Sequence, residues 1–100
     1  VYELLGMSKL PSAVFVASDI QALSVMKVAR QLGIKIPDDV AIIGFDDIDV
    51  AEHVDLTTIC QHLDESGRLA AEILLTRIRE HDRPLQHITL PLNLIERLTT

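Results

Sequence analysis

The stretch IPDDVAIIGFDD, Ile36 to Asp47, decides the fold of this chain. It opens with the turn residues Pro37–Asp39 and continues as the apolar run Val40–Phe45, which is rich in β-branched side chains. Such a run indicates a strand buried on both faces, as in a parallel sheet between two helical layers. The run ends in two carboxylates, Asp46 and Asp47. Ligands of open α/β sheets bind just outside the carboxyl ends of the strands, so this acidic pair is a candidate ligand contact.

The segment before this stretch completes a strand–helix–strand unit. Ala13–Ala17 is a second apolar strand candidate. Either Ser18 or Asp19 can cap the helix that follows, because a short side-chain oxygen accepts an unpaired N–H of the first turn. Apolar residues then recur with helical spacing over Ile20–Leu32. The right-handed crossover of such a unit makes its two strands parallel, so Ser18 and Asp46 are expected at the same edge of the sheet.

The second half of the chain predicts further short elements around one long helix. A loop with one short turn is expected over Ile48–Asp55 and a strand over Leu56–Gln61. The helix would begin at Asp64 or Ser66 and end near His81, and two strand-like runs would follow over Gln86–Leu90 and Leu92–Ile95. The apolar face of the helix comprises Leu69, Ala70, Ile73, Leu74 and Ile78. This face is wider than a solvent-exposed helix tolerates, so something must cover it. We expect the chain to self-associate through this helix; the alternative is that the helix folds back on its own strand–helix–strand unit.

Composition excludes several classes of protein. The hydrophobic content of 48% in 100 residues suits one small globular unit or part of a larger one, and the start at Val1 suggests a fragment. The net charge of −6, with three aromatic residues and no basic stripe, argues against direct binding of nucleic acid. No apolar run approaches the roughly 18 residues of a membrane span. The single cysteine excludes an internal disulfide and fits a reducing compartment.

The chemical motifs leave three interpretations of Asp46 and Asp47 open. They can form a structural turn, contact a polar ligand, or serve metal or phosphoryl chemistry. Adjacent residues of an extended chain point to opposite faces, so only one of the two is expected to look into a given pocket. The four histidines lack the spacing of a zinc site, and Cys60 has no basic neighbour in sequence. With no nucleophile elbow and no phosphate-binding loop, the sequence predicts no enzyme, no metal and no cofactor.

Taken in series, the motifs resemble the lactose/galactose-repressor (LacI/GalR) family of bacterial transcription regulators. The segments that carry the resemblance, in the family's order and spacing, are Pro11–Asp19, Ala22-Leu23, Gly33, Ile36–Val40, Ile43–Asp47, Leu56–Ile59 with Gln61, Gly67-Arg68 with Ala70-Ala71, Leu90-Pro91 and Glu96–Thr100. Any one segment is a weak signal. The series covers nearly all of the chain from Pro11 onward.

The resemblance implies a parallel-sheet α/β fragment of a two-lobed, type I periplasmic-binding-protein-like effector domain. Residues 1–60 and about 90–100 would belong to the C-terminal lobe, and residues of about 61–89 to the other lobe. The positions matching Ser18, Asp46 and Gln61 line the ligand cleft in the family. Asp46 is the one expected to hold hydroxyl or amine groups of the ligand, and Ser18 stands where many relatives carry the longer Asn.

The resemblance also implies the partners. The effector would be a sugar or a nucleobase-like metabolite, and the protein would be a cytoplasmic homodimer or higher homo-oligomer. DNA would be bound only through an upstream helix-turn-helix that these residues do not contain, and no membrane is involved. The alternative function is a periplasmic solute-binding protein for transport, which shares the fold. A phospho-receiver or an enzyme using Asp46 lacks supporting catalytic groups.

Overall fold

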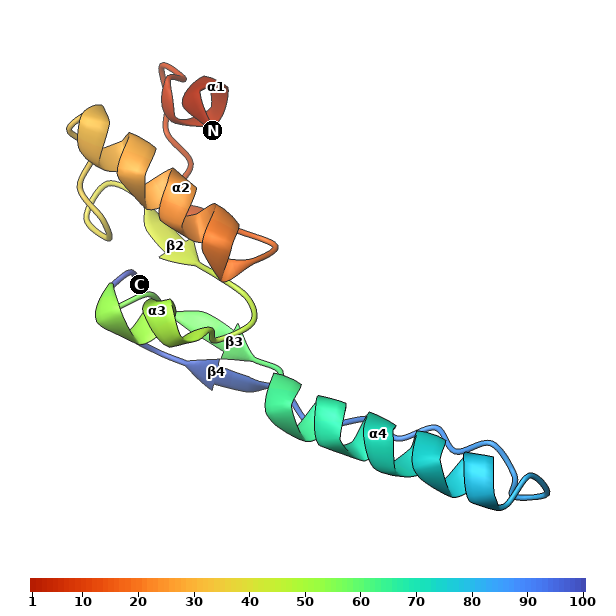
Figure 1. The fold of residues 1–100 in the computed structure, drawn as a ribbon. Coiled ribbons are helices and arrows are strands. Elements are labelled where there is room, and N and C mark those ends of the chain that lie inside the picture. Colours follow the sequence, from red (N-terminus) through yellow and green to blue (C-terminus); the bar gives the residue numbers. More distant parts are fainter.

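A computed structural model describes residues 1–100 as a small body from which a long arm projects (Figure 1). The body contains α1, β1, α2, β2, α3, β3 and β4, and the arm contains α4 with the segment that returns beside it. The bounds are α1 Tyr2–Leu5, β1 Ala13–Phe15, α2 Asp19–Gln31, β2 Ala41–Ile43, α3 Asp49–His53, β3 Thr58–Cys60, α4 Leu63–Arg79 and β4 Asn93–Ile95.

The predicted strand–helix–strand unit is confirmed. β1 and β2 pair in parallel, with Val14 opposite Ile42. α2 connects them, and its N-cap is Ser18, whose Oγ accepts a hydrogen bond from the Gln21 N–H at 3.3 Å. The cap satisfies one of the backbone donors that a helix start leaves unpaired. Both strands are shorter than predicted, since regular pairing of the two stops at Phe15 and Ile43.

The far edge of β2 is completed by two segments distant in sequence. The Gly44 N–H donates to the Thr57 carbonyl at 2.9 Å, and the Ile42 N–H donates to the Thr99 carbonyl at 2.8 Å. β3 and β4 form a separate antiparallel pair with Ile59 opposite Leu94. The side chain of Thr99 joins the two systems, because its Oγ accepts from the Thr57 N–H at 2.9 Å and donates to the Ile42 carbonyl at 2.7 Å.

Replacing Thr99 with Val should lower the free energy of unfolding by about 2 kcal/mol, because valine keeps the shape but leaves two buried backbone groups without their partner. Urea unfolding measures the effect. Thr89→Val is the matched control, since Thr89 is exposed and makes no side-chain hydrogen bond to the chain. Equal costs at both positions would show that the Thr99 hydroxyl does not join the two segments.

The prediction that the central strand is buried on both faces is wrong. One face packs on α2 and α3 in a core cluster that consists of Leu5, Val16, Ala22, Val25, Val28, Ala29, Ile42, Ala51 and Leu56. On the other face Phe15 is 63% exposed and Ile43 only half-buried. An apolar groove lined by residues of β1, β2 and Thr100 runs along this face. A strand becomes buried on both sides only where a second layer is present, and these 100 residues supply one layer.

The arm gives the molecule its length. The molecule measures 60 × 24 × 18 Å, and its radius of gyration of 18.4 Å exceeds the roughly 13 Å of a compact chain of this size. α4 buries none of its 17 residues. The alternative that the helix folds back on the strand–helix–strand unit is therefore contradicted. Whether residues of about 61–89 belong to a second lobe stays a prediction.

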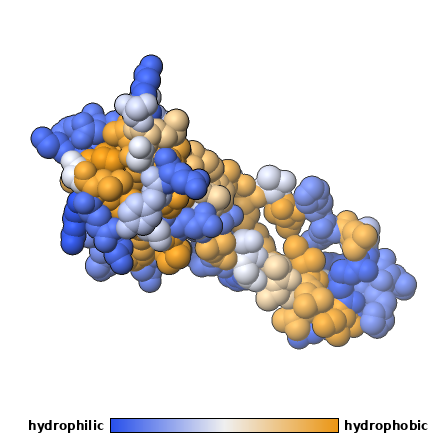
Figure 2. All heavy atoms as spheres, turned by 90° about the horizontal axis from the view of Figure 1, so that it is seen from above, coloured by the Kyte–Doolittle hydropathy of each residue, from blue (hydrophilic) through white to orange (hydrophobic).

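The strand predicted over Gln86–Leu90 does not form. This segment runs back beside α4 (Figure 1), and a helix offers it no backbone ladder with which to pair. The second run forms a strand over Asn93–Ile95 because β3 lies next to it. Figure 2 shows apolar residues on the surface of the arm as well as on the body.

A ladder of opposite charges lies on the exposed side of α4. Arg68 binds Glu65 through its Nη2 at 2.5 Å and Glu72 through its Nη1 at 2.6 Å. The hydrogen bond from Arg68 holds the pKa of Glu65 below its usual range, and the same bond raises the pKa of Arg68. The support that this pair gives α4 is present above the unfolded pKa of Glu65 and is lost as the pH falls through the lowered folded value.

Candidate functional site

The carboxyl ends of β1 and β2 meet at one edge of the sheet, as predicted. The Val16 N–H donates to the Ile43 carbonyl and the Asp19 N–H to the Phe45 carbonyl, each at 2.8 Å. The residues after β1 therefore lie beside those that follow β2. This edge is where an open α/β sheet presents side chains to a ligand.

Asp46 occupies this edge with an unusual backbone. Its φ is 117°, in the left-handed half of the map that residues with a side chain rarely adopt. The Asp46 N–H donates to the Ile59 carbonyl at 2.9 Å, and the Asp46 Oδ1 accepts from the Gln61 Nε2 at 2.5 Å. Two of the three residues predicted to contact a ligand are thus hydrogen-bonded to each other. No group of the chain donates to the Asp46 Oδ2, which leaves that oxygen open to an incoming donor.

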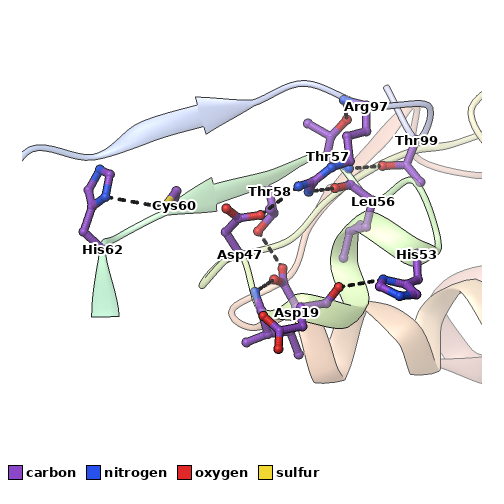
Figure 3. A network of polar contacts seen from close by, with 12 residues as sticks. Asp19, Asp47, His53, Leu56, Thr57, Thr58, Cys60, His62, Arg97 and Thr99 are labelled. Atoms are coloured by element: carbon purple, nitrogen blue, oxygen red, sulfur yellow. Dashed lines mark hydrogen bonds and ion pairs between the residues drawn. The ribbon is translucent and has the colours of Figure 1, made fainter. Parts of the chain in front are cut away.

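Asp47 has a different role from its neighbour. The premise that the pair lies on an extended chain is wrong, because Asp47 has a φ of 55°. Its Oδ1 accepts from the Arg97 Nη2 at 3.0 Å, and both side chains are mostly buried (Figure 3). Arg97 also donates through Nη1 to the Leu56 carbonyl at 2.8 Å. Asp47 therefore fixes the loop after β2 to the chain after β4. The sequence analysis predicted no contact for the Arg97 side chain.

Ser18 lies at the same edge but is not joined to the other two candidates. Its Oγ is the α2 cap described above, and no hydrogen bond links it to Asp46 or Gln61. A serine hydroxyl that accepts a backbone N–H still has its proton to donate. Ser18 thus combines the structural role predicted for it with a donor at this edge of the sheet.

Asp19 holds the edge together from beneath. This carboxylate is fully buried. Its Oδ1 accepts from the Thr58 hydroxyl at 2.6 Å, and its Oδ2 accepts from the Ile48 N–H at 3.0 Å (Figure 3). One side chain in the first turn of α2 therefore ties that helix to β3 and to the loop that carries Asp46. The sequence indicated Asp19 only as a possible cap.

The loop after β2 and the start of α4 line an open, acidic cavity of about 570 Å³. Its lining residues are Asp46, Asp47, Ile48, Asp49, Cys60, His62, Leu63 and Asp64. Carboxylates accept hydrogen bonds from hydroxyl and amine groups, so the cavity suits a ligand rich in donors. The chain brings no three His, Cys, Asp or Glu side chains into a group that could hold a metal ion.

Cys60 lies closer to a base than the sequence suggested. Its Sγ is 3.8 Å from the His62 Nδ1, and the His62 Nε2 is 2.6 Å from the Asn93 Oδ1 (Figure 3 shows the first contact). The backbone of His62 has a φ of 52°. The contacts place His62 at the junction of β3, β4 and α4, where the arm leaves the body.

The comparison with protein families decides the assignment of the fold. Residues 2–100 match the family described as the periplasmic binding protein-like domain. The chain belongs to this family. More narrowly, it is a fragment of the effector-binding domain of LacI-type transcriptional regulators, as its sequence motifs predicted. No helix of this periplasmic binding protein-like chain is long and apolar enough to cross a membrane.

Two repressors illustrate the sequence relationship of this periplasmic binding protein-like chain. It is 46% identical over 85 residues to the HTH-type transcriptional repressor PurR of Vibrio parahaemolyticus. The matched region covers 81% of this chain and 25% of that repressor. It is 43% identical over 81 residues to the ribose operon repressor of Haemophilus influenzae, with 79% of the chain and 24% of the repressor covered. The chain thus spans about a quarter of the length of these relatives. They are transcriptional repressors, in agreement with the prediction that the chain is not an enzyme.

Solved structures confirm the predicted α/β fold. A LacI-type regulator from Bacillus cereus subsp. cytotoxis superposes with a TM-score of 0.94 at 26% identity, over 100% of this chain and 36% of that one. A LacI family transcriptional regulator from Enterococcus faecalis V583, solved with bound ribose, gives a TM-score of 0.93 at 36% identity. That match covers 100% of this chain and 38% of the regulator.

Proposed function

We propose that this chain supplies one wall of the effector site of a cytoplasmic, DNA-binding transcriptional regulator. The effector is a small molecule rich in hydroxyl or amine groups, either a sugar or a nucleobase-like metabolite. The observation that carries the proposal is Asp46: a carboxylate at the carboxyl end of β2, with one oxygen held by Gln61 and the other open. A carboxylate fixed in this way is positioned to accept a hydrogen bond from a ligand.

Gln61 and Ser18 are the proposed partners of Asp46. The Gln61 side chain fixes the rotamer of Asp46, so that little side-chain entropy is lost when ligand binds. Ser18 offers a hydroxyl at the neighbouring strand end, next to the α2 N-terminus. Together the three residues can accept from and donate to the same polar ligand. The relatives support a regulator over a transport protein, since those described above are repressors.

The known ligands of similar structures agree with this chemistry. Regulators similar to this chain have been solved with bound ribose and with bound sucrose, and one is described as a complex with cellobiose. These three ligands share many hydroxyl groups and carry no charge. A carboxylate with a free oxygen suits such ligands because it accepts hydrogen bonds without competing donors.

The proposed mechanism is a shift between lobe arrangements. A ligand that contacts Asp46 more favourably in one arrangement raises the population of that arrangement. The ligand can shift this equilibrium by no more than the difference between its affinities for the two arrangements, so a contact made by Asp46 in only one of them raises the limit of the switch.

Replacing Asp46 with Ala should weaken effector binding by about 2 kcal/mol, roughly 30-fold in Kd, because a hydrogen bond to a charged group is lost. The test uses a chimera in which this chain replaces the matching segment of the Haemophilus influenzae ribose operon repressor. Calorimetry with ribose, sucrose, cellobiose and free nucleobases first identifies the compound that binds. The control is Asp38→Ala, which removes an exposed carboxylate from the opposite end of β2. Unchanged affinity in a folded Asp46→Ala chimera would refute the role of Asp46.

A further inference from the structure

Three polar side chains contact one another in series where β3, β4 and α4 meet. The Cys60 Sγ lies 3.8 Å from the His62 Nδ1 (Figure 3), and the His62 Nε2 lies 2.6 Å from the Asn93 Oδ1. The strand register sets this arrangement, because Cys60 of β3 pairs directly opposite Asn93 of β4. His62 follows two residues later as the N-cap of α4. The three residues, defined here as the Cys60 triad, supply a nucleophile, a base and a group that orients the base.

Asn93 determines which nitrogen of the imidazole carries the proton. The Oδ1 atom of an amide only accepts hydrogen bonds, so the His62 Nε2 donates to it. In the neutral ring the Nδ1 then has a free lone pair, and this atom faces the Cys60 Sγ. The thiol therefore donates its S–H to an imidazole nitrogen that is able to take up the proton. This is the arrangement in which an imidazole activates a sulfur nucleophile.

The Cys60 triad opens into the acidic cavity described above. Cys60 and His62 are both half-buried, and both line this cavity together with the carboxylates of Asp46, Asp47, Asp49 and Asp64. A single β-bridge pairs Asp46 with Cys60, so the two residues occupy neighbouring positions in the lining. The Asp46 Oδ2 has no donor within the chain. A small ligand that donates a hydroxyl group to Asp46 is thus held beside the sulfur.

We propose that Cys60 captures a small, uncharged hydroxy-aldehyde in this cavity as a reversible hemithioacetal, with His62 moving the proton. The sulfur attacks the carbonyl carbon, so that a C–S bond forms and the π bond of the carbonyl breaks toward oxygen. The thiol proton passes to the His62 Nδ1 and from there to the new alkoxide oxygen. The reaction is an addition, so it needs no oxidant and releases no leaving group.

The lining of the cavity favours this class of ligand. Carboxylates accept hydrogen bonds from hydroxyl groups, and the four in the lining repel an anionic electrophile. An aldehyde that carries a hydroxyl group satisfies both conditions, whereas an aldehyde that carries a carboxylate satisfies neither. The volume of about 570 Å³ lies within the usual range for sites that bind small molecules.

The rate at which Cys60 is alkylated tests the role of His62. Cys60 is the only cysteine, so the carbamidomethyl group that iodoacetamide adds to the thiol, counted by mass spectrometry, reports on this sulfur alone. His62→Asn should slow the reaction by about 100-fold, the lower end of what general-base catalysis contributes. Asparagine tolerates the left-handed backbone of this position, where φ is 52°. His81→Asn is the control, because His81 is exposed at the end of the arm. Equal rates in the two variants would overturn the proposal.

Two substitutions of Asn93 test its role as a positioning residue. Asn93→Leu removes the acceptor of the His62 Nε2–H and should slow alkylation toward the rate of His62→Asn. Asn93→Asp keeps an acceptor and should retain the natural rate. Asn93 is exposed, so both variants should stay folded, as judged by circular dichroism. A natural rate in Asn93→Leu, or an equal loss in both variants, would contradict the orientation of the imidazole and with it the proposal.

Protection of Cys60 from iodoacetamide tests the class of ligand. Glycolaldehyde and glyoxylate are two-carbon aldehydes that carry a hydroxyl group and a carboxylate, respectively. The concentration of glycolaldehyde that halves the alkylation rate should be about tenfold lower for Cys60 than for free N-acetylcysteine amide, because a hydrogen bond to a carboxylate is worth about that factor in affinity. Glyoxylate should protect Cys60 less well than glycolaldehyde does. Dilution should restore the free thiol.

The same assay in the chimera described above, read on the peptide that contains Cys60, repeats the test with the rest of a regulator present. The proposal rests on the cavity of the proposed effector site, but the two fail separately, because the adduct is measured on the sulfur and effector affinity on Asp46. Equal protection of Cys60 and of the free thiol would overturn the proposal. So would stronger protection by glyoxylate than by glycolaldehyde, or a Cys60 that does not react in the chimera.

Discussion

Replacing Asp19 with Ala is expected to lower the free energy of unfolding of this chain by about 4 kcal/mol. The buried carboxylate accepts hydrogen bonds from the Thr58 hydroxyl and the Ile48 N–H. Alanine leaves the buried Thr58 hydroxyl and the half-buried Ile48 N–H without a partner. It also removes a negative charge from the first turn of α2, where the helix dipole favours one. Urea unfolding followed by circular dichroism measures the loss.

Asp39→Ala is the matched control for Asp19→Ala. Asp39 also accepts a backbone hydrogen bond, from the Lys35 N–H at 2.8 Å, but its side chain is exposed. Water can replace that bond, so the same substitution should cost about 1 kcal/mol or less there. Similar costs at the two positions would show that Asp19 does not anchor the edge of the sheet.

Gly44→Ala should lower the free energy of unfolding by about 3 kcal/mol, at the upper end of the range for overpacked cores. A Cβ at Gly44 would overlap the Asp19 carboxylate and lie 3.1 Å from the Leu56 Cδ2. The Asp19 side chain cannot move away from this Cβ without breaking its hydrogen bonds to Thr58 and Ile48. Gly67→Ala is the control, because the Cβ there meets open space and alanine favours a helix.

The two large effects should not be additive. In the Asp19→Ala background the overlapping carboxylate is gone, so Gly44→Ala should cost clearly less than in the natural chain. A double-mutant cycle measures this coupling. Additive costs would mean that the methyl group added at Gly44 is accommodated without pressing on Asp19, contrary to the contact that the structure shows.

The strand–helix–strand unit could be predicted because its signals are local. The apolar run before Asp46, the helical period after Asp19 and the cap at Ser18 can each be read within a few residues. Parallel pairing then follows from handedness alone. The same logic places Ser18 and Asp46 at one edge of the sheet.

The rest of the site depends on contacts that leave no local signal. Asp47 and Arg97 are 50 residues apart in the chain. Nothing in the sequence around either residue indicates that the two side chains form an ion pair. The run Gln86–Leu90 is β-prone, but a run of sequence does not reveal whether a partner backbone lies beside it. Nor does the apolar pattern of a strand show whether one or two layers cover it, which is why the open face around Phe15 was not foreseen.

The sheet of the body is closed by residues that follow the arm. Ile42 and Thr99 are 57 residues apart, so the whole arm lies inside the loop that their pairing closes. Loop-closure entropy grows with the length of flexible chain, and an ordered arm shortens the flexible part. Any partner that binds the folded arm, and not the unfolded one, shifts the equilibrium toward the closed state. Covering α4 should therefore raise the unfolding temperature of a sheet that α4 does not touch.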